Sequence, residues 1–493
     1  NTTPRSNPSR NFNPVNLVNT RRIGGRALAP DIPDDVSLTT AERNQPTELL
    51  GAVKATGQIG QFRYGMLGAF ENDVKFDGTG DAGGDVNLYQ SGRDYAVIRA
   101  LFEPDTSGAY IGAGFLSSAV LHPNRDAMVH SVDLHYYTKD RSLRTDAQLL
   151  LSDIKSRDPS PGAMFESSTG AGGFLDLAYI PRKGLEHNLQ LEYFDKDLNL
   201  NDLGFQRRAD IYGTRYSFTH TKSDIQGLQR LRTSGFLGAG WNTDNRVVLL
   251  GGNIRQDYLF NSLNSLQVRL GYSPARFEDR NSFDNGTYRI NTRWDGRLEF
   301  ATNNTKRVAL RVSSRAQQED LGGWLRGYTA GMTLRLSNRM TAEVSVRHNN
   351  RDAWLLHTGD DTFATFKSKT WAPRLSFDFF PTARQQFRIA LQWVAVDASE
   401  REFFSIPTQA GRLIPRTPDE AADSEDFTVS RVNLQVRYRW EIAPLSDLFL
   451  VYTRASALDS MPGTDFDQLF SDSFESPFLE QLVLKLRYRL GSR

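Results

Sequence analysis

The sequence predicts an all-β chain, specifically a transmembrane antiparallel β-barrel of about 22 strands, with 20–24 allowed by the uncertainty of strand boundaries. Three observations lead to this fold class. Apolar residues recur with a period of two, strand candidates are long, and the connections between them alternate between short turns and long polar loops.

The period-two pattern is clearest near the end of the chain. In the segment LVLKLRYRL (482–490), four leucines and Tyr488 share one parity, while Lys485, Arg487 and Arg489 occupy the other. Side chains of a strand point alternately to its two faces, so this segment has one apolar and one polar face. The same alternation appears in RVNLQVRYRW (431–440), SLQVRLGY (265–272) and QFRIALQW (386–393). No comparable stretch keeps an apolar stripe at helical spacing, which indicates an all-β chain.

Strand length and loop length distinguish a membrane barrel from a soluble sheet. Strands that cross lipid need about 9–11 residues, whereas soluble strands usually have about five or six. Short turns are expected at 303–306, 337–339, 381–384 and 442–446, and long polar loops at 71–92, 154–170, 196–208, 353–364, 400–425 and 457–477. This asymmetry is typical of bacterial outer-membrane barrels. The alternative, a very large soluble sandwich, solenoid or propeller, would require a fixed repeat that the sequence does not contain.

Aromatic residues at the ends of the apolar stripes are candidate membrane-interface anchors. The predicted set is Tyr193, Tyr272, Phe379, Trp440, Tyr452 and Tyr488.

Composition excludes several classes of function. Lys and Arg total 59 and Asp and Glu total 58, so no basic excess indicates nucleic-acid binding. Cysteine is absent, which excludes disulfides, thiolate metal sites and a cysteine nucleophile. No run of 18 apolar residues exists, so a membrane role would require a barrel. No signal peptide is visible at the start, and we expect the numbering to begin after processing or within a longer precursor.

The predicted organisation has three parts. Residues 1–15 form a periplasmic N-terminal segment, with the barrel lumen as an alternative location, residues 16–490 form the barrel, and residues 491–493 form a tail. Within the barrel, 16–24 is the expected first strand and 25–46 the first outer loop, because an even strand count requires one rising strand before residue 47. The C-terminus is then periplasmic, in the outer membrane of a Gram-negative bacterium.

Two motifs near the start carry a family resemblance. NTRRIGGRALAP (19–30) and TELLGAVKATGQIGQFRYGMLGAF (47–70), together with the ending LFLVYTR (448–454) and LVLKLRYRL, resemble an uncharacterised family of outer-membrane proteins. The resemblance implies a barrel. Longer members of that family carry an N-terminal domain similar to family-nine carbohydrate-binding modules. That domain is not within the printed sequence, so sugar binding is assigned to none of its residues.

Candidate metal and catalytic groups are few. Asp77, Asp81 and Asp85 lie among glycines in the loop 71–92, where oxygen ligands would suit calcium, but their spacing matches no EF-hand and a mobile loop is the alternative. His130 and His135 are five residues apart and therefore lie on opposite faces of a strand, which does not favour a shared metal. No nucleophile elbow, phosphate loop or zinc signature is present, so neither an enzyme nor a cofactor is expected.

Five basic residues are predicted to line the lumen near its periplasmic end, opposite the apolar parity. They are Arg437, Arg439, Lys485, Arg487 and Arg489. One interpretation is a positive ring that attracts anions or an acidic partner. The other is that water-facing positions are simply polar.

The expected function is that of a porin-like channel or translocation pore with an obstructed lumen, because barrels of about 22 strands have a plugged lumen. The alternative is a structural membrane anchor for a surface or periplasmic partner. Expected partners are outer-membrane lipid and lipopolysaccharide, and a polypeptide that plugs or caps the barrel.

Overall fold

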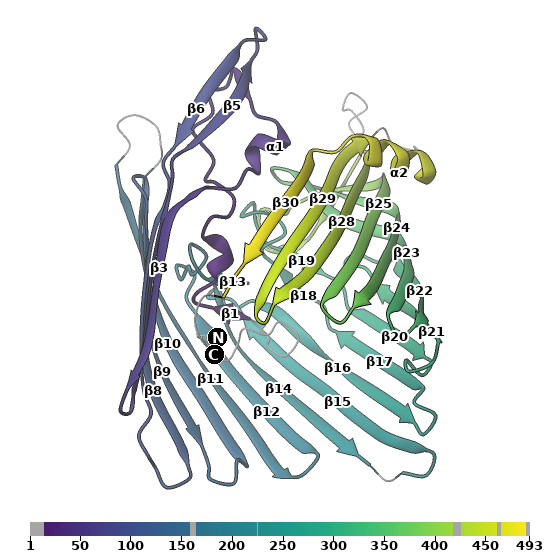
Figure 1. The fold of residues 1–493 in the computed structure, drawn as a ribbon. Helices are drawn as coiled ribbons and strands as arrows, with labels where there is room; N and C mark the ends of the chain where they lie inside the picture. Colours follow the sequence, from purple (N-terminus) through teal and green to yellow (C-terminus); the bar gives the residue numbers. More distant parts are fainter. Residues whose placement is uncertain (1–13, 158–163, 224, 418–424, 461–464, 490–493) are drawn as a thin grey trace. The chain divides into compact units, whose positions relative to one another are not determined.

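A computed structural model describes residues 14–157, 164–223, 225–417, 425–460 and 465–489 (Figure 1). Within these ranges, 22 strands belong to one large antiparallel sheet with the hydrogen-bond topology of a barrel. The predicted fold class, an all-β barrel of about 22 strands, is confirmed. No helix in the described part of the chain is long and apolar enough to cross a membrane.

The chain divides into two compact units. Unit 1 comprises residues 1–219 and 236–247, and unit 2 comprises residues 220–235 and 248–493. The sheet strands that lie wholly or largely in unit 1 are β3 (Leu49–Ile59), β4 (Phe62–Glu71), β7 (Asp94–Phe102), β8 (Tyr110–Leu121), β9 (Arg125–Tyr137), β10 (Leu143–Ser156), β11 (Glu166–Arg182), β12 (Leu185–Phe194) and β14 (Ile211–Lys222). Strand β15 (Leu228–Trp241) has residues in both units.

The sheet strands of unit 2 include the longest in the chain. They are β16 (Val247–Phe260), β17 (Ser265–Ser273), β20 (Arg293–Ala301), β21 (Val308–Gln318), β22 (Trp324–Ser337), β23 (Met340–Gly359), β24 (Thr362–Thr382), β25 (Gln385–Ser405), β27 (Ile414–Arg416), β28 (Phe427–Ala443), β29 (Ser446–Ser460) and β30 (Leu479–Arg487). Every sheet strand except the three-residue β27 has at least nine residues, the length that crossing lipid requires.

Shorter elements lie in the connections. Unit 1 contains β1 (Val15–Asn16), the 3₁₀ turn η1 (Thr20–Arg22), β2 (Val36–Ser37), α1 (Thr40–Arg43), β5 (Val74–Gly80), β6 (Asp85–Gln90) and β13 (Phe205–Gln206). Unit 2 contains β18 (Arg276–Glu278), β19 (Tyr288–Ile290), β26 (Gly411–Arg412) and α2 (Phe466–Glu475). In unit 2 a buried apolar cluster joins these connections to the end of β24; it consists of Tyr288, Ile290, Phe363, Ile406 and Leu413.

The predicted first strand at 16–24 is wrong. Only Val15 and Asn16 are extended, and they pair with β13 instead of joining the large sheet. The Asn19 side chain then accepts a hydrogen bond from the Arg21 amide and caps a 3₁₀ turn, and Gly24 adopts φ +66°. These turn-forming residues interrupt the alternation, so the segment cannot continue as a spanning strand.

Two further predictions are wrong. One is the loop at 353–364, and the other is that no stretch places apolar residues at helical spacing. Strands β23 and β24 continue to Gly359 and Thr362, so that only residues 360–361 turn between them. The predicted loop 457–477 contains α2, where Phe466, Phe470 and Phe474 recur every four residues beside Leu469. The short turns expected at 337–339, 381–384 and 442–446 separate consecutive strands as predicted.

Helix α2 packs against β25, β28 and β29. Leu469 is fully buried, and its carbonyl accepts a hydrogen bond of 3.2 Å from the Ser430 hydroxyl. The Arg454 guanidinium of β29 donates to the Phe474 carbonyl at 2.9 Å, at the negative end of the helix dipole, and also bonds Glu480 at 3.3 Å. These contacts hold the middle and the C-terminal end of the helix on the sheet.

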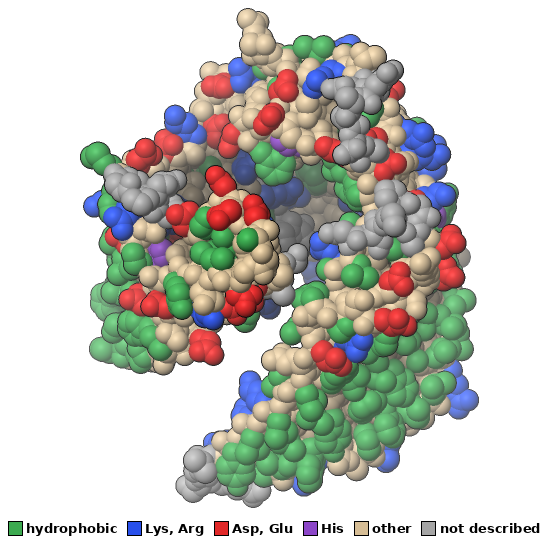
Figure 2. Space-filling view, turned by 90° about the horizontal axis from the view of Figure 1, so that it is seen from above, with side chains coloured by type: hydrophobic (Ala, Val, Ile, Leu, Met, Phe, Trp, Pro, Cys, Tyr) green, Lys and Arg blue, Asp and Glu red, His purple; other side chains and the backbone are tan. Residues whose placement is uncertain are grey.

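Each long strand has an apolar face and a polar face. On β9, Met128, Val132 and Leu134 are 40–51% exposed, whereas Ser131 and Asp133 between them are buried. The exposed residues are therefore the apolar ones, the reverse of a soluble sheet. Figure 2 shows hydrophobic side chains gathered over broad areas of the surface.

Candidate functional site

The polar face of unit 1 is covered by two segments of the same chain, residues 14–27 and 195–206, which we call the covering segments. Val15, Leu17, Leu198, Leu200 and Leu203 within them are at most 3% exposed. Leu203 packs in a cluster with residues on the polar face of five strands, namely Ala69, Tyr95, Val97, Val120, Ala127 and Ile154. Val18 and Ile23 pack against the same cluster. Near one end of the strands, the otherwise polar face of unit 1 therefore carries apolar side chains, and the covering segments bury them.

Polar contacts join the two covering segments to each other and to the sheet. The Asn19 amide donates to the Leu203 carbonyl at 2.8 Å, and the Asn199 amide donates to the Ser152 hydroxyl of β10 at 3.1 Å. Arg125 of β9 forms an ion pair of 2.7 Å with Asp202. These bonds satisfy backbone groups that the close packing removes from water.

Glu71, at the end of β4, holds the N-terminal covering segment. Its side chain is 1% exposed, accepts a hydrogen bond of 2.8 Å from the Gly24 amide and forms an ion pair of 2.8 Å with Arg93. Tyr95 donates a further hydrogen bond of 3.0 Å to the same carboxylate. A buried carboxylate with three partners is a specific docking point for this segment.

Glycines on β11 allow the second covering segment to lie directly on the sheet. A Cβ at Gly170 would lie 2.1 Å from the Leu198 amide nitrogen, and a Cβ at Gly172 would lie 2.7 Å from the Leu198 side chain. Within the covering segment, a Cβ at Gly204 would lie 2.4 Å from the Asn16 carbonyl oxygen. No larger residue fits at these positions without moving the chain.

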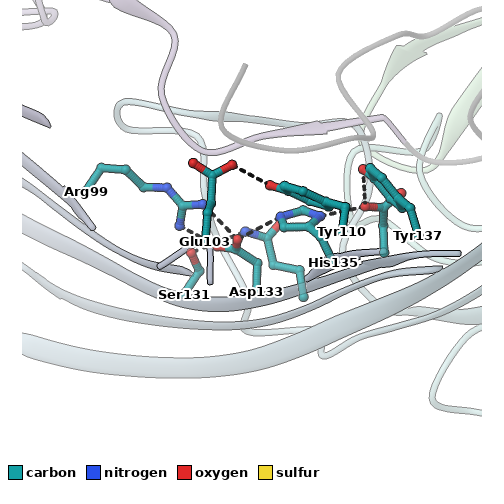
Figure 3. A network of polar contacts seen from close by, with 9 residues as sticks. Arg99, Glu103, Tyr110, Ser131, Asp133, His135 and Tyr137 are labelled. Carbon is teal, nitrogen blue, oxygen red and sulfur yellow. Dashed lines mark hydrogen bonds and ion pairs between the residues drawn. The ribbon is translucent and has the colours of Figure 1, made fainter. Parts of the chain in front are cut away.

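A dense network of charged side chains occupies the polar face nearer the turns at 103–109 and 138–142 (Figure 3). The Arg99 guanidinium of β7 bonds the Asp133 carboxylate of β9 at 2.7 Å, and the Asp133 side chain is only 2% exposed. His135 lies between two carboxylates, 2.9 Å from Asp133 and 2.5 Å from Asp146. Tyr137 adds a hydrogen bond of 3.1 Å to Asp146.

The network continues toward β4 and β8. Tyr110 donates to the Glu103 carboxylate at 2.8 Å (Figure 3). Arg63 pairs with the same carboxylate at 2.8 Å. Beyond it, in the turn that follows β9, hydrogen bonds from the Thr138 and Ser142 hydroxyls lower the pKa of Asp140 to about 2. The arrangement can bind or repel charged groups through hydrogen bonds and electrostatics. Among the described residues, no cluster of His, Asp and Glu could hold a metal ion.

The two histidines singled out in the sequence lie on opposite faces of β9, as predicted. His135 belongs to the network on the polar face. His130 lies on the apolar face, 3.0 Å from the Ser117 hydroxyl of β8.

Two of the five predicted lumen-lining basic residues meet at one carboxylate. Arg439 and Arg487 both pair with Asp447, whose side chain is 1% exposed, and the Arg439 contact is 2.8 Å. Arg437 faces Arg388 across β25 and β28, Lys485 faces Phe449, and the Arg489 amide donates to the Ser446 hydroxyl. A positive ring that attracts anions stays a prediction.

The proposed calcium ligands are not assembled into a site. Asp77 lies on β5, where it forms an ion pair of 2.8 Å with Lys75, Asp81 lies in the following turn and Asp85 begins β6. Residues 74–80 and 85–90 of this predicted loop pair with each other and form a β-hairpin.

The predicted interface aromatics lie on the apolar parity of their strands. Tyr193, Tyr272, Trp440 and Tyr488 are 41–57% exposed. Tyr272 lies against Trp294, with ring centroids 4.5 Å apart, and Tyr452 donates to Glu480 at 2.5 Å. Phe379 faces Met340 and Phe387 across the sheet.

Sequence reasoning missed the charged network of unit 1. A signal was present in HSVDLHYY (130–137), where Asp133 and His135 share the parity opposite Val132 and Leu134. Their partners Arg99 and Asp146 come from other strands, and only the register places them together. The covering segments carried a weaker signal in the glycines of STGAGG (168–173).

The long antiparallel strands and their exposed apolar face define this chain as a β-barrel protein. It belongs to the family described as a domain of unknown function, DUF5916, whose model matches residues 117–491. The comparison with curated proteins found no match.

Solved structures with a similar fold include three metal or siderophore proteins. The FrpB iron transporter from Neisseria meningitidis (F3-3 variant) is 12% identical, covers 82% of this chain and 74% of its own, and has a TM-score of 0.47. A mutant ferric enterobactin receptor from Pseudomonas aeruginosa is 7% identical, with coverage of 82% and 75% and a TM-score of 0.43. The copper transporter OprC is 9% identical, with coverage of 86% and 75% and a TM-score of 0.31.

Proposed function

We propose that this protein is an outer-membrane β-barrel of a Gram-negative bacterium that acts as a transport channel whose passage is obstructed by its own covering segments. The single observation that carries the proposal is the docking of residues 14–27 and 195–206 on the polar face of unit 1. We also propose that β30 runs from the long connection that contains α2 toward the periplasm, because the long connections of outer-membrane barrels face outward.

The membrane location is supported by the exposed apolar face. Large apolar side chains on consecutive strands, including Phe115, Val132 and Leu149, are 44–66% exposed. Burying such side chains contributes about 1.5–3 kcal/mol each, so a surface formed by many of them is stable only against lipid or another apolar surface. Strands of nine or more residues match the hydrocarbon thickness of a bilayer.

The obstruction is supported by how firmly the covering segments are held. Five of their apolar side chains are almost fully buried, and Glu71, Arg125 and Ser152 of the sheet hold the segments by polar contacts. Segments that open easily have few buried contacts. We therefore expect the docked state to dominate at equilibrium, with opening driven by a partner or a substrate.

Planar-bilayer conductance tests the proposal. Full-length protein should show no large steady current, and a variant that lacks residues 14–23 should show currents of porin size. A matched deletion of residues 81–84, in the turn between β5 and β6, should leave the conductance at the full-length level. Large, steady currents from the full-length protein would contradict the obstruction and favour a porin. Silence of both proteins would favour a membrane anchor for a surface or periplasmic partner.

A further inference from the structure

An apolar groove of about 480 Å³ lies on unit 2, across strands β20 to β24. Leu298, Val312 and Tyr328 at its edges are 51–53% exposed, so the groove opens on the apolar face of the sheet. Its volume is within the range of about 300–1,000 Å³ usual for small-molecule sites.

Strand register explains why a hollow forms here. Two neighbouring rows of residues cross the five strands, and they read Leu298–Ser314–Tyr328–His348–Trp371 and Phe300–Val312–Ala330–Val346–Pro373. In these rows the small residues Ser314 and Ala330 sit between large apolar neighbours. Directly opposed side chains of an antiparallel pair are about 4.5–5.5 Å apart, so a small residue among large ones leaves a depression.

Aromatic side chains form one wall of the groove. The rings of His348 and Trp371 lie with centroids 4.3 Å apart, and Tyr328 is the neighbour of His348 across the β22–β23 pair. Such a wall has a large apolar area that loses little side-chain freedom on binding, because these rings have few rotatable bonds. The groove is thus shaped for a hydrocarbon chain.

Cationic side chains border the groove on the side of the long connections. The next row, two residues beyond Tyr328 and His348, contains Arg326, Asn350 and Lys369. Lys367 and Lys369 are exposed on the same face of β24. Two carboxylates are also close, because Asp352 contacts Arg326 at 3.2 Å and Asp397 faces Lys369 across β24 and β25. Three cations and two carboxylates leave a positive excess.

From this placement we infer that the groove binds an acyl chain of a phosphorylated outer-leaflet lipid of the lipid A type, with a phosphate over Arg326 and Lys369. The inference rests on the proposed outer-membrane location and orientation. Acyl-chain burial provides the apolar contact, and the cations select an anionic headgroup. The site is distinct from the covering segments of unit 1.

Native mass spectrometry of delipidated protein, titrated with bis-phosphorylated lipid A and separately with phosphatidylethanolamine, tests the site. Wild-type protein should retain one lipid A under conditions that strip phosphatidylethanolamine. Ala330→Trp fills the groove and should lower lipid A occupancy about tenfold, which corresponds to about 1.4 kcal/mol of binding. Ala342→Trp, on the apolar face of β23 but outside the groove, should bind lipid A as the wild type does.

A second pair of variants tests the headgroup. Arg326→Gln combined with Lys369→Gln should weaken lipid A binding several-fold, whereas Arg347→Gln combined with Arg374→Gln, on the polar face of β23 and β24, should not. Heat-modifiable mobility on gels reports whether each variant forms a folded barrel. Equal binding by folded Ala330→Trp protein would overturn the site, and equal retention of both lipids would overturn the phosphate contact. Recovery of the protein outside the outer-membrane fraction would instead refute the proposed function.

Discussion

Replacing Gly170 by valine should release the covering segment 195–206 from the polar face of unit 1. A Cβ at this position would lie 2.1 Å from the Leu198 amide nitrogen and 2.2 Å from the Asp197 carbonyl carbon. Both are main-chain atoms, so the clash cannot be relieved by rotating a side chain. The covering segment must move as a whole.

The free energy that holds segment 195–206 on the sheet determines how large a perturbation is needed to release it. Leu198, Leu200 and Leu203 are 1–3% exposed, and burial contributes about 1.5–3 kcal/mol for each, or roughly 4.5–9 kcal/mol together. Truncation of Leu203 to alanine removes about 2–5 kcal/mol. The remaining leucines and polar contacts still favour docking, so we expect Leu203→Ala protein to remain mostly obstructed. Gly170→Val should give a larger conductance.

Single-channel recordings in planar bilayers compare the conductance of the full-length protein with that of the two variants. Full-length protein should be nearly silent, Leu203→Ala should open rarely, and Gly170→Val should show long openings. Ala171→Val, which places the same valine side chain on the opposite face of β11, is the control and should resemble wild type. If folded Gly170→Val protein, identified by heat-modifiable mobility, conducts no more than Ala171→Val, then segment 195–206 does not obstruct the passage.

Three further predictions concern the barrel itself. Leu484→Arg places a charge on the apolar face and should destabilise the folded barrel by about 2–4 kcal/mol, measured by urea titration in lipid vesicles. Gln435→Arg, on the polar face, should be tolerated. Equal effects of the two substitutions would refute the assignment of the two faces. Asp133→Ala leaves Arg99 without its buried carboxylate and should lower the unfolding free energy by about 3–5 kcal/mol in the same titration. A protease site inserted at 81–84 should be cut on whole cells and one at 337–339 protected; the opposite result would invert the orientation.

The period-two pattern was sufficient to predict the sheet. On β9 the apolar residues Met128, Val132 and Leu134 of the alternation all lie on the exposed face, because a strand's geometry fixes alternate side chains to opposite sides. Segment 16–24 was misassigned, because the even strand count required a strand before residue 47, whereas Asn19 and Gly24 form turns that compete with one.

The candidate site was largely beyond sequence reasoning. Asp133, His135 and Asp146 come together only when β9 and β10 pair in one register, and the contact of Leu203 with Val97 and Val120 joins residues more than 80 positions apart. The pattern along one strand cannot reveal which strand lies beside it. It does show which face each side chain occupies.

The position of Arg454 has a consequence for the order of folding. Arg454 lies on the apolar parity of β29, where the Phe474 carbonyl and Glu480 bind its guanidinium. A guanidinium without these partners would enter the bilayer at a cost of several kcal/mol. The connection that carries α2 must therefore fold together with the last hairpin and not after it. The step that completes the sheet in the membrane then includes the formation of a helix, and a chain in which α2 cannot form should accumulate as a late insertion intermediate.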